Sequence, residues 1–111
     1  MSDVIIKGED KTLIALVTLG DDRDISTATE VTATIKDRSR SNTTVNGPTI
    51  TCTNTGDADW RAGKVAVPYT AAQTATLDTG CGYELELKIT IGGVIRKGFS
   101  VELIDVYDSD S

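Results

Sequence analysis

The dominant signal along the chain is an alternation of apolar and polar residues with a period of two. It is clearest over residues 83–91, where Tyr83, Leu85, Leu87, Ile89 and Ile91 oppose Glu84, Glu86, Lys88 and Thr90. Successive side chains of a strand point to opposite faces, so this pattern predicts a strand with one face in the core. The same alternation recurs at residues 30–36, 49–53, 64–69 and 99–103, the last with Phe99, Val101 and Leu103 expected to face the core, and a further strand is predicted at residues 11–19.

Turn-forming residues separate these segments. Gly92-Gly93 lies between two strand patterns and predicts a tight hairpin, because such turns need positive φ at both central positions. Asn46-Gly47-Pro48 and the stretches 20–22 and 54–57 mark further turns. Short antiparallel strands with turns between them predict an all-β sandwich of about seven strands.

Residues 70–79 form the stretch with helical character. Thr70 suits the N-cap position, and Gly80 comes just past the expected end. The segment predicts one short helical crossover between the sheets.

Two N-terminal segments break the alternation, because residues 4–6 and 13–17 are apolar on both faces. Pro68 indicates an edge strand, since proline cannot donate to a ladder. One interpretation is that the N-terminal strand crosses between the sheets and is buried on both sides. The other is that these residues form an interface with another subunit, a predicted set comprising Val4, Ile5, Ile6, Leu13, Ile14, Leu16 and Pro68.

Length and charge narrow the classes of function. With 111 residues the chain fits one domain, predicted at residues 1–107, followed by a flexible acidic end at 108–111. The net charge is −6 and the Lys and Arg residues are scattered, which disfavours nucleic acid and anionic membranes as partners. Residues 1–7 lack the features of a secretory signal, so we expect synthesis in a cytoplasm.

The sequence favours a non-enzymatic protein without cofactors. It contains no histidine, the commonest general base, and no phosphate-binding glycine motif. Two acidic groups, Asp21, Asp22 and Asp24 and then Asp105, Asp108 and Asp110, do not match the spacing of a calcium loop. We interpret them as a solvated turn and a solvated tail, and we expect no metal site.

Cys52 and Cys81 lie in separate predicted elements. In a reducing compartment the expectation is two free thiols, with a Cys52–Cys81 disulfide as the alternative. Cys81 stands between two glycines and has no adjacent cation to activate it, so a tight turn is favoured over a nucleophile.

Trp60 admits two interpretations. Sugar-binding modules stack ligands on exposed rings, and Trp60 follows a turn-like Asp-Ala-Asp segment. The second interpretation, which we favour, is that the ring plugs one end of the sandwich.

Several motifs occur in an order that is similar to a known family. They are Ile-Ile-Lys-Gly-Glu-Asp-Lys-Thr-Leu at 5–13, Thr-Ala-Thr-Ile-Lys at 32–36, Asp-Trp-Arg-Ala-Gly-Lys-Val-Ala-Val at 59–67, Thr-Ala-Ala-Gln-Thr-Ala-Thr-Leu at 70–77, and Gly-Tyr-Glu-Leu-Glu-Leu at 82–87 before the Gly-Gly hairpin. Over nearly its whole length the chain resembles the Ig-like domains of phage tail and baseplate proteins, such as the N-terminal domain of the baseplate upper protein. The resemblance implies an Ig-like sandwich that is made in the host cytoplasm, incorporated into a virion, and carries no catalytic residues.

The leading functional prediction is therefore a phage structural or assembly protein, a tail or baseplate component. It would bind other phage structural proteins or its own copies, as a homo-oligomer, through an edge strand or the apolar N-terminal segments. The alternative is a carbohydrate- or cell-surface-binding Ig-like module that uses Trp60 as its ligand residue.

Overall fold

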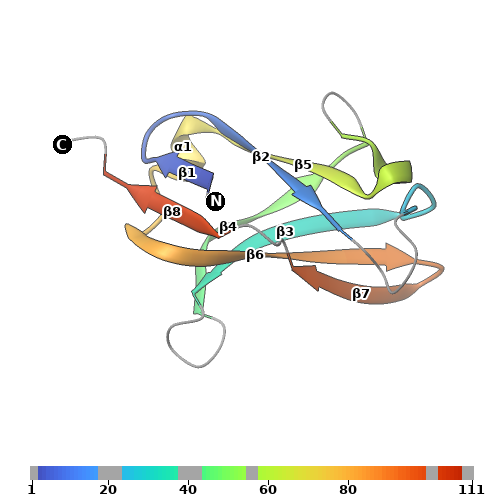
Figure 1. Ribbon diagram of the computed structural model, residues 1–111. Coiled ribbons are helices and arrows are strands. Elements are labelled where there is room, and N and C mark those ends of the chain that lie inside the picture. Colours follow the sequence, from blue (N-terminus) through green and yellow to red (C-terminus); the bar gives the residue numbers. More distant parts are fainter. Residues whose placement is uncertain (1–2, 18–23, 38–43, 55–57, 100–102, 109–111) are drawn as a thin grey trace.

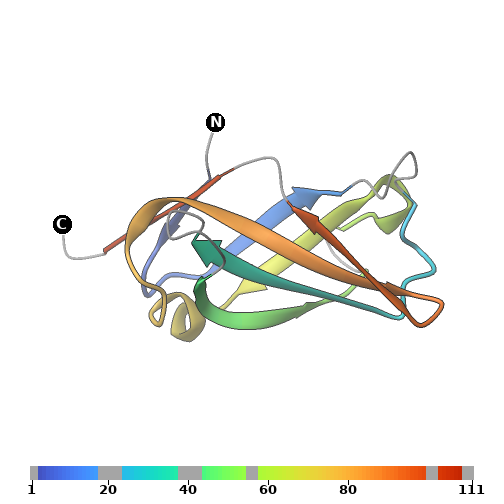
Figure 2. The ribbon, with the colours of Figure 1, turned by 90° about the horizontal axis from the view of Figure 1, so that it is seen from below.

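Two β-sheets of unequal size pack face to face (Figure 1). The computed structural model describes residues 3–17, 24–37, 44–54, 58–99 and 103–108. In Figure 2 the larger sheet lies in front of the smaller one. The larger sheet contains β1 (Asp3–Ile6), β3 (Glu30–Asp37), β4 (Thr44–Cys52), β6 (Gly80–Ile91), β7 (Val94–Phe99) and β8 (Ile104–Tyr107), and the smaller contains β2 (Lys11–Leu16) and β5 (Lys64–Tyr69).

Strand β6 organises the larger sheet. One side of β6 pairs antiparallel with β3, which in turn pairs with β4. Its other side is shared, because β8 pairs with its first residues and β7 with its last. Strand β1 lies beyond β8 and runs parallel to it. This pairing pattern, with β2 and β5 as a separate sheet, is the arrangement expected of an Ig-like sandwich.

The core fills the space between the two sheets. Inward-facing residues of β2 and β5, among them Leu13 and Val67, pack with those of β3 and β6, among them Ile35 and Leu87. Along β2 and β3 the buried residues alternate with exposed or half-buried ones, as half-buried strands require. Burial of these apolar side chains supplies most of the drive to fold.

A short crossover carries the chain from the smaller sheet to the larger one. It contains α1 (Ala71–Thr74), where the Thr70 hydroxyl accepts from the Gln73 backbone N–H and the Gln73 side chain accepts from the Thr70 N–H. This capping box satisfies two backbone donors at the helix start. The fully buried Leu77 then seals the crossover against the core.

The hydroxyl of Tyr83 fixes the end of this crossover. It donates to the backbone carbonyls of Asp78 and Thr79, at 3.3 and 3.1 Å. A tyrosine near the start of this strand whose hydroxyl bonds back to the preceding corner is a hallmark of Ig-type sandwiches. A Cβ on Gly80 would come within 2.6 Å of the same hydroxyl, so the corner requires glycine at this position.

Strand β4 holds the crossover from the opposite side. The buried Asn46 donates from Nδ2 to the Asp78 carbonyl and accepts at Oδ1 from the Asp78 N–H, at 3.1 and 2.7 Å. Beside it, Gly47 has φ of 86° and approaches Leu77 so closely that a Cβ would clash. Asn46 and Gly47 therefore dock β4 against the crossover.

The structure confirms the predicted all-β sandwich with one short helical crossover, and the described residues form eight strands. Two details differ. Asn46-Gly47-Pro48 does not form a turn but lies within β4, where the pairing with β3 shifts register. The last strand begins at Ile104, so Leu103 is exposed and does not face the core. The end of the strand predicted at 11–19, the predicted turn at 20–22, Val101, residues 55–57 and the tail residues 109–111 fall outside the described ranges.

We expect Tyr83→Phe to lower the free energy of unfolding by about 1 kcal/mol, because the two carbonyls lose their shared donor. Tyr69→Phe is the matched control, since the buried Tyr69 hydroxyl has no hydrogen-bond partner among the described residues. Removing that hydroxyl is expected to be neutral or stabilising. Urea denaturation of both variants measures the difference, and equal losses would contradict the proposed role of Tyr83.

Candidate protein-binding surface

The structure divides the predicted interface residues into two groups. Ile5 and Leu13 are buried in the domain's own core, so the prediction that they lie at a subunit interface is corrected. Val4, Ile14, Leu16 and Pro68 remain exposed, and Ile6 is half-buried. Strand β2 is therefore not buried on both sides, because only its odd-numbered residues enter the core.

The exposed residues of β2 form an apolar strip on the outer face of the smaller sheet. Ile14 is 37% exposed and Leu16 is 59% exposed. Opposite them on β5 lie Ala66 and Lys64, and Pro68 lies opposite Thr12. We call Thr12, Ile14 and Leu16 the β2 strip.

The outer edge of β2 also has no backbone partner among the described residues. Val17 donates its N–H to the Gly63 carbonyl at 2.8 Å, which places the odd-numbered residues in the bonded pairs with β5. Bonded and non-bonded pairs alternate along an antiparallel ladder. The N–H and C=O groups of the β2 strip therefore point away from β5, and no described backbone group bonds to them.

The corresponding edge of β5 is closed. Lys64 exchanges two backbone hydrogen bonds with Asp59, both 2.8 Å long. Pro68, whose position also points away from β2, has no N–H to offer. The prediction that Pro68 marks an edge strand is confirmed, and the proline blocks strand addition at that point.

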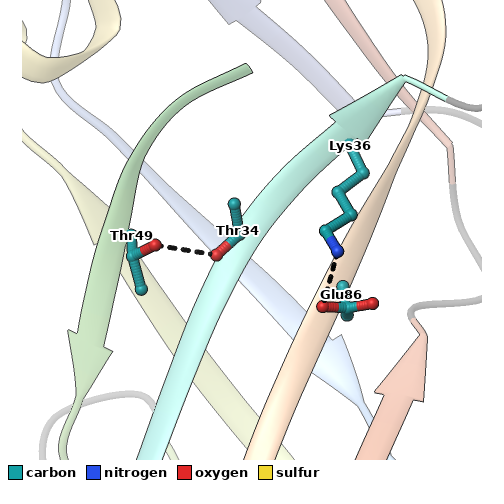
Figure 3. Close-up of polar contacts among 4 residues, drawn as sticks. All are labelled: Thr34, Lys36, Thr49 and Glu86. Carbon is teal, nitrogen blue, oxygen red and sulfur yellow. Dashed lines mark hydrogen bonds and ion pairs between the residues drawn. The ribbon is translucent and has the colours of Figure 1, made fainter. Parts of the chain in front are cut away.

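On the outer face of the larger sheet, four polar residues of β3, β4 and β6 contact one another in pairs (Figure 3). The hydroxyls of Thr34 and Thr49 lie 3.1 Å apart across β3 and β4. On the neighbouring pair of strands, the Lys36 ammonium lies 3.0 Å from the carboxylate of Glu86, whose side chain is almost fully buried. A paired carboxylate needs no external cation, so this part of the face, over β3 and the middle of β6, offers little for a partner to complete.

Trp60 is 7% exposed and belongs to the core, which confirms the plug interpretation. It begins the short helix η1 (Trp60–Ala62), and its backbone connects neighbouring loops. Its N–H donates to the Asn54 side chain, and its carbonyl accepts from Ile25. A buried ring cannot stack on a sugar, so the carbohydrate-binding alternative loses the residue on which it depended.

Both cysteines are free thiols, so the alternative of a Cys52–Cys81 disulfide is not formed. Burial raises the pKa of Cys52 to about 11. Cys81 is exposed and lies beside Tyr107, whose pKa is raised by the Asp105 carboxylate and by contact with Cys81. No described cation offsets this effect of burial on Cys52.

The described part of the acidic groups shows ordinary local bonding. Asp24 accepts the Ser26 N–H at 2.9 Å, and its hydrogen bonds to Ser26 lower its pKa. Asp21, Asp22 and Asp110 lie outside the described residues. Among the residues that are described, no three Cys, Asp or Glu side chains gather where they could hold a metal ion, and no helix is long and apolar enough to cross a membrane.

No family model, curated protein or solved structure matches the chain. A protein-binding surface is therefore inferred from its geometry alone.

The sequence pattern identified Ile14, Leu16 and Pro68, but it did not predict which backbone groups of β2 point away from β5. The Val17–Gly63 bond sets that pattern, and no local sequence signal predicts it.

We expect acrylamide to quench Trp60 fluorescence severalfold less in the native protein than in the denatured protein, because the ring is buried. Emission should be blue-shifted and should not respond to glycans. Since the chain contains a single tryptophan, the signal reports this position alone. Strong native quenching would contradict the buried placement.

We expect a chromogenic disulfide reagent at pH 8 to modify Cys81 rapidly and Cys52 only after denaturation. Cys52 is buried and its pKa of about 11 leaves little thiolate at that pH. Counting modified thiols in native protein and in urea gives the comparison. The two single variants identify the reactive thiol. Native Cys52→Ser, which keeps Cys81, should react rapidly, whereas native Cys81→Ser, which keeps Cys52, should not.

Proposed function

We propose that this chain is a non-enzymatic structural subunit that binds other protein chains, and first its own copies, through β2. The observation that carries the proposal is the β2 strip, which combines outward backbone groups that no described residue pairs with and the exposed side chains of Ile14 and Leu16. An open strand edge is a template for adding another strand, because the backbone itself supplies the hydrogen bonds.

The β2 strip suits pairing between two copies of the chain. In an antiparallel pair centred on Ile14, each Ile14 lies opposite its symmetry mate, and Thr12 lies opposite Leu16 of the partner. The outward groups of the strip would then form about six backbone hydrogen bonds. Ile14 and Leu16 would bury apolar surface across the two-fold axis, and no like charges would meet within the strip.

The edges of β4 and β5 are protected against strand addition, which supports β2 as the strand that pairs with a second copy. Strand β5 is closed by Pro68 and by the Asp59–Lys64 pair. Strand β4 carries a register shift and Pro48 along its length. Bulges and prolines are common devices that prevent edge-to-edge association. The β2 strip has neither device.

We further propose that the particle in which this subunit assembles is a phage virion, as a tail or baseplate component. The resemblance of the motif order to the Ig-like domains of such proteins supports this assignment. Its other partners would then be phage structural proteins, which it meets after synthesis in the host cytoplasm. Repeated self-association of small sandwich domains suits particles built from symmetric copies.

We expect Ile14→Lys to abolish self-association, because two ammonium groups would face each other across the two-fold axis. Light scattering on a sizing column, from micromolar to near-millimolar protein, measures the mass. Val45→Lys is the matched control, since Val45 is also an exposed apolar strand residue but lies on β4. It should associate as the unaltered chain does.

The proposal fails if the unaltered chain is a monomer at every concentration. It also fails if Val45→Lys dissociates the assembly while Ile14→Lys preserves it. Circular dichroism of each variant establishes that the loss of association occurs in a folded domain.

A further inference from the structure

The edge of β7 is a second place where a strand can be added. Residues Gly92 and Gly93 both have positive φ and close a two-residue hairpin between Ile91 and Val94. In such a hairpin the flanking residues form a bonded pair. By alternation, Arg96 and Gly98 also bond to β6, whereas the N–H and C=O groups of Ile95 and Lys97 point outward.

The larger sheet has one described strand fewer beside β7 than beside β8, and we call the place beside β7 the notch. Strands β8 and β7 occupy the same side of β6, one after the other. Strand β1 covers the outer edge of β8, but no described strand pairs with the outer edge of β7. Figure 1 shows β1 beside β8 at one end of the sheet and β7 on its own at the other end. An added strand beside β7 would continue the row that β1 begins.

The side chains around the notch carry a distinctive chemistry. Lys97 lies directly opposite Lys88 on one face of the hairpin, and Arg96 projects from the other face. All three side chains are exposed, and none forms an ion pair with another described residue. Like charges directly opposite each other are destabilising. A ligand with carboxylates would relieve this repulsion.

Apolar surface lies next to these cations. Val94 is 57% exposed and Ile95 is 63% exposed, although both belong to a strand. A guest strand with two acidic residues opposite Arg96 and Lys97 would place its next two residues opposite Ile95 and Val94. Those two residues should be apolar, whichever direction the guest runs.

Two other occupants fit this edge poorly. If β7 paired antiparallel with β7 of a second copy around Arg96 or Lys97, two like charges would meet, and around Ile95 the cations would lie opposite Val94 and Gly93, where they have no carboxylate. Nucleic acid could bind the three cations but would leave Val94 and Ile95 without contacts. The net charge of −6 also opposes the approach of a polyanion. Both arguments favour a protein strand.

We infer that the β7 edge is a docking site for an extended segment of a different protein, with two adjacent carboxylates followed or preceded by two apolar residues. The segment adds to the sheet beside β7, as an extended peptide adds to other exposed sheet edges. Its carboxylates pair with Arg96 and Lys97, and its apolar side chains cover Ile95 and Val94. The inference does not depend on pairing through β2.

A pair of synthetic peptides tests this site. The acidic peptide is acetyl-Thr-Glu-Glu-Val-Val-Thr-amide, and the control peptide replaces both glutamates by lysine. Titration of the full chain carrying Ile14→Lys, followed by amide NMR shifts, keeps the β2 edge out of the measurement. We expect the acidic peptide to shift the amides of Ile95 and Lys97 and the lysine peptide to leave them unchanged.

Charge reversal provides the decisive comparison. Arg96→Glu combined with Lys97→Glu should weaken the acidic peptide by about tenfold or more and should create binding of the lysine peptide. Both positions are exposed, so the unperturbed amide spectrum of the core establishes that the variant is folded. Thr51→Glu, at an exposed site on β4, is the control and should change neither affinity.

Three outcomes would overturn the inference. One is the absence of shifts at β7 with millimolar acidic peptide, and another is equal binding of both peptides. The third is binding of a thymidine hexanucleotide at β7 that is tighter than that of the acidic peptide, which would assign the edge to nucleic acid. Shifts at β7 that depend on the glutamates and invert with charge reversal would establish the site.

Discussion

The crossover between β5 and β6 is the constraint on which the rest of the molecule depends. It joins the two sheets, and contacts from three parts of the chain hold it in place. The Tyr83 hydroxyl donates to the last carbonyls of the crossover, and the Asn46 side chain binds the Asp78 backbone from β4. The fully buried Thr74 hydroxyl donates to the Glu9 carbonyl and accepts from the Gly8 N–H. Tyr83 is local to the crossover, but Asn46 is 32 residues from Asp78 and Gly8 is 66 residues from Thr74, so these contacts need β4 and the β1–β2 turn in place. The crossover fixes the distance between the sheets, and therefore the depth of the core.

The contacts with Thr74 also explain why an edge of β2 is left open. They anchor the turn between β1 and β2 against α1, and Asp10 adds a bond from its carboxylate to the Ala71 N–H. The chain before this turn leads to β8, where Lys7 donates to the Tyr107 carbonyl. Strand β1 therefore joins the larger sheet and does not lie beside β2. The exposed strip on β2 follows from this anchoring.

The sequence predicted the strands well because the period of two reports burial directly. Residues 64–69 were predicted with the bounds of β5, and Thr70 was identified as the helix cap. The turn prediction from sequence was wrong where a tertiary contact overrides local turn chemistry. Asn46-Gly47-Pro48 has the composition of a turn, but Asn46 is bound to Asp78 and Gly47 packs on Leu77, so the segment remains in β4. Glu86 lies on a face that alternation assigns to solvent, yet it is buried with Lys36. The apolar residues of the candidate surface were found by pattern, whereas the free backbone groups depend on which strand lies next to which.

The strand edges differ in charge and in proline content, which favours a different protein partner for each open edge. Proline interrupts β4 and β5, where self-pairing would compete with the sandwich. The β2 strip presents an uncharged apolar row, whose symmetry permits a second copy to pair with it. The β7 edge presents Arg96 and Lys97, for which another β7 offers no carboxylate. The edges of β2 and β7 belong to different sheets, so a guest at one leaves the hydrogen bonds of the other untouched. Under the two proposals above, a single small sandwich would distinguish copies of itself from other proteins by the charge pattern of its edges, because the backbone hydrogen bonds that attract any strand are common to both.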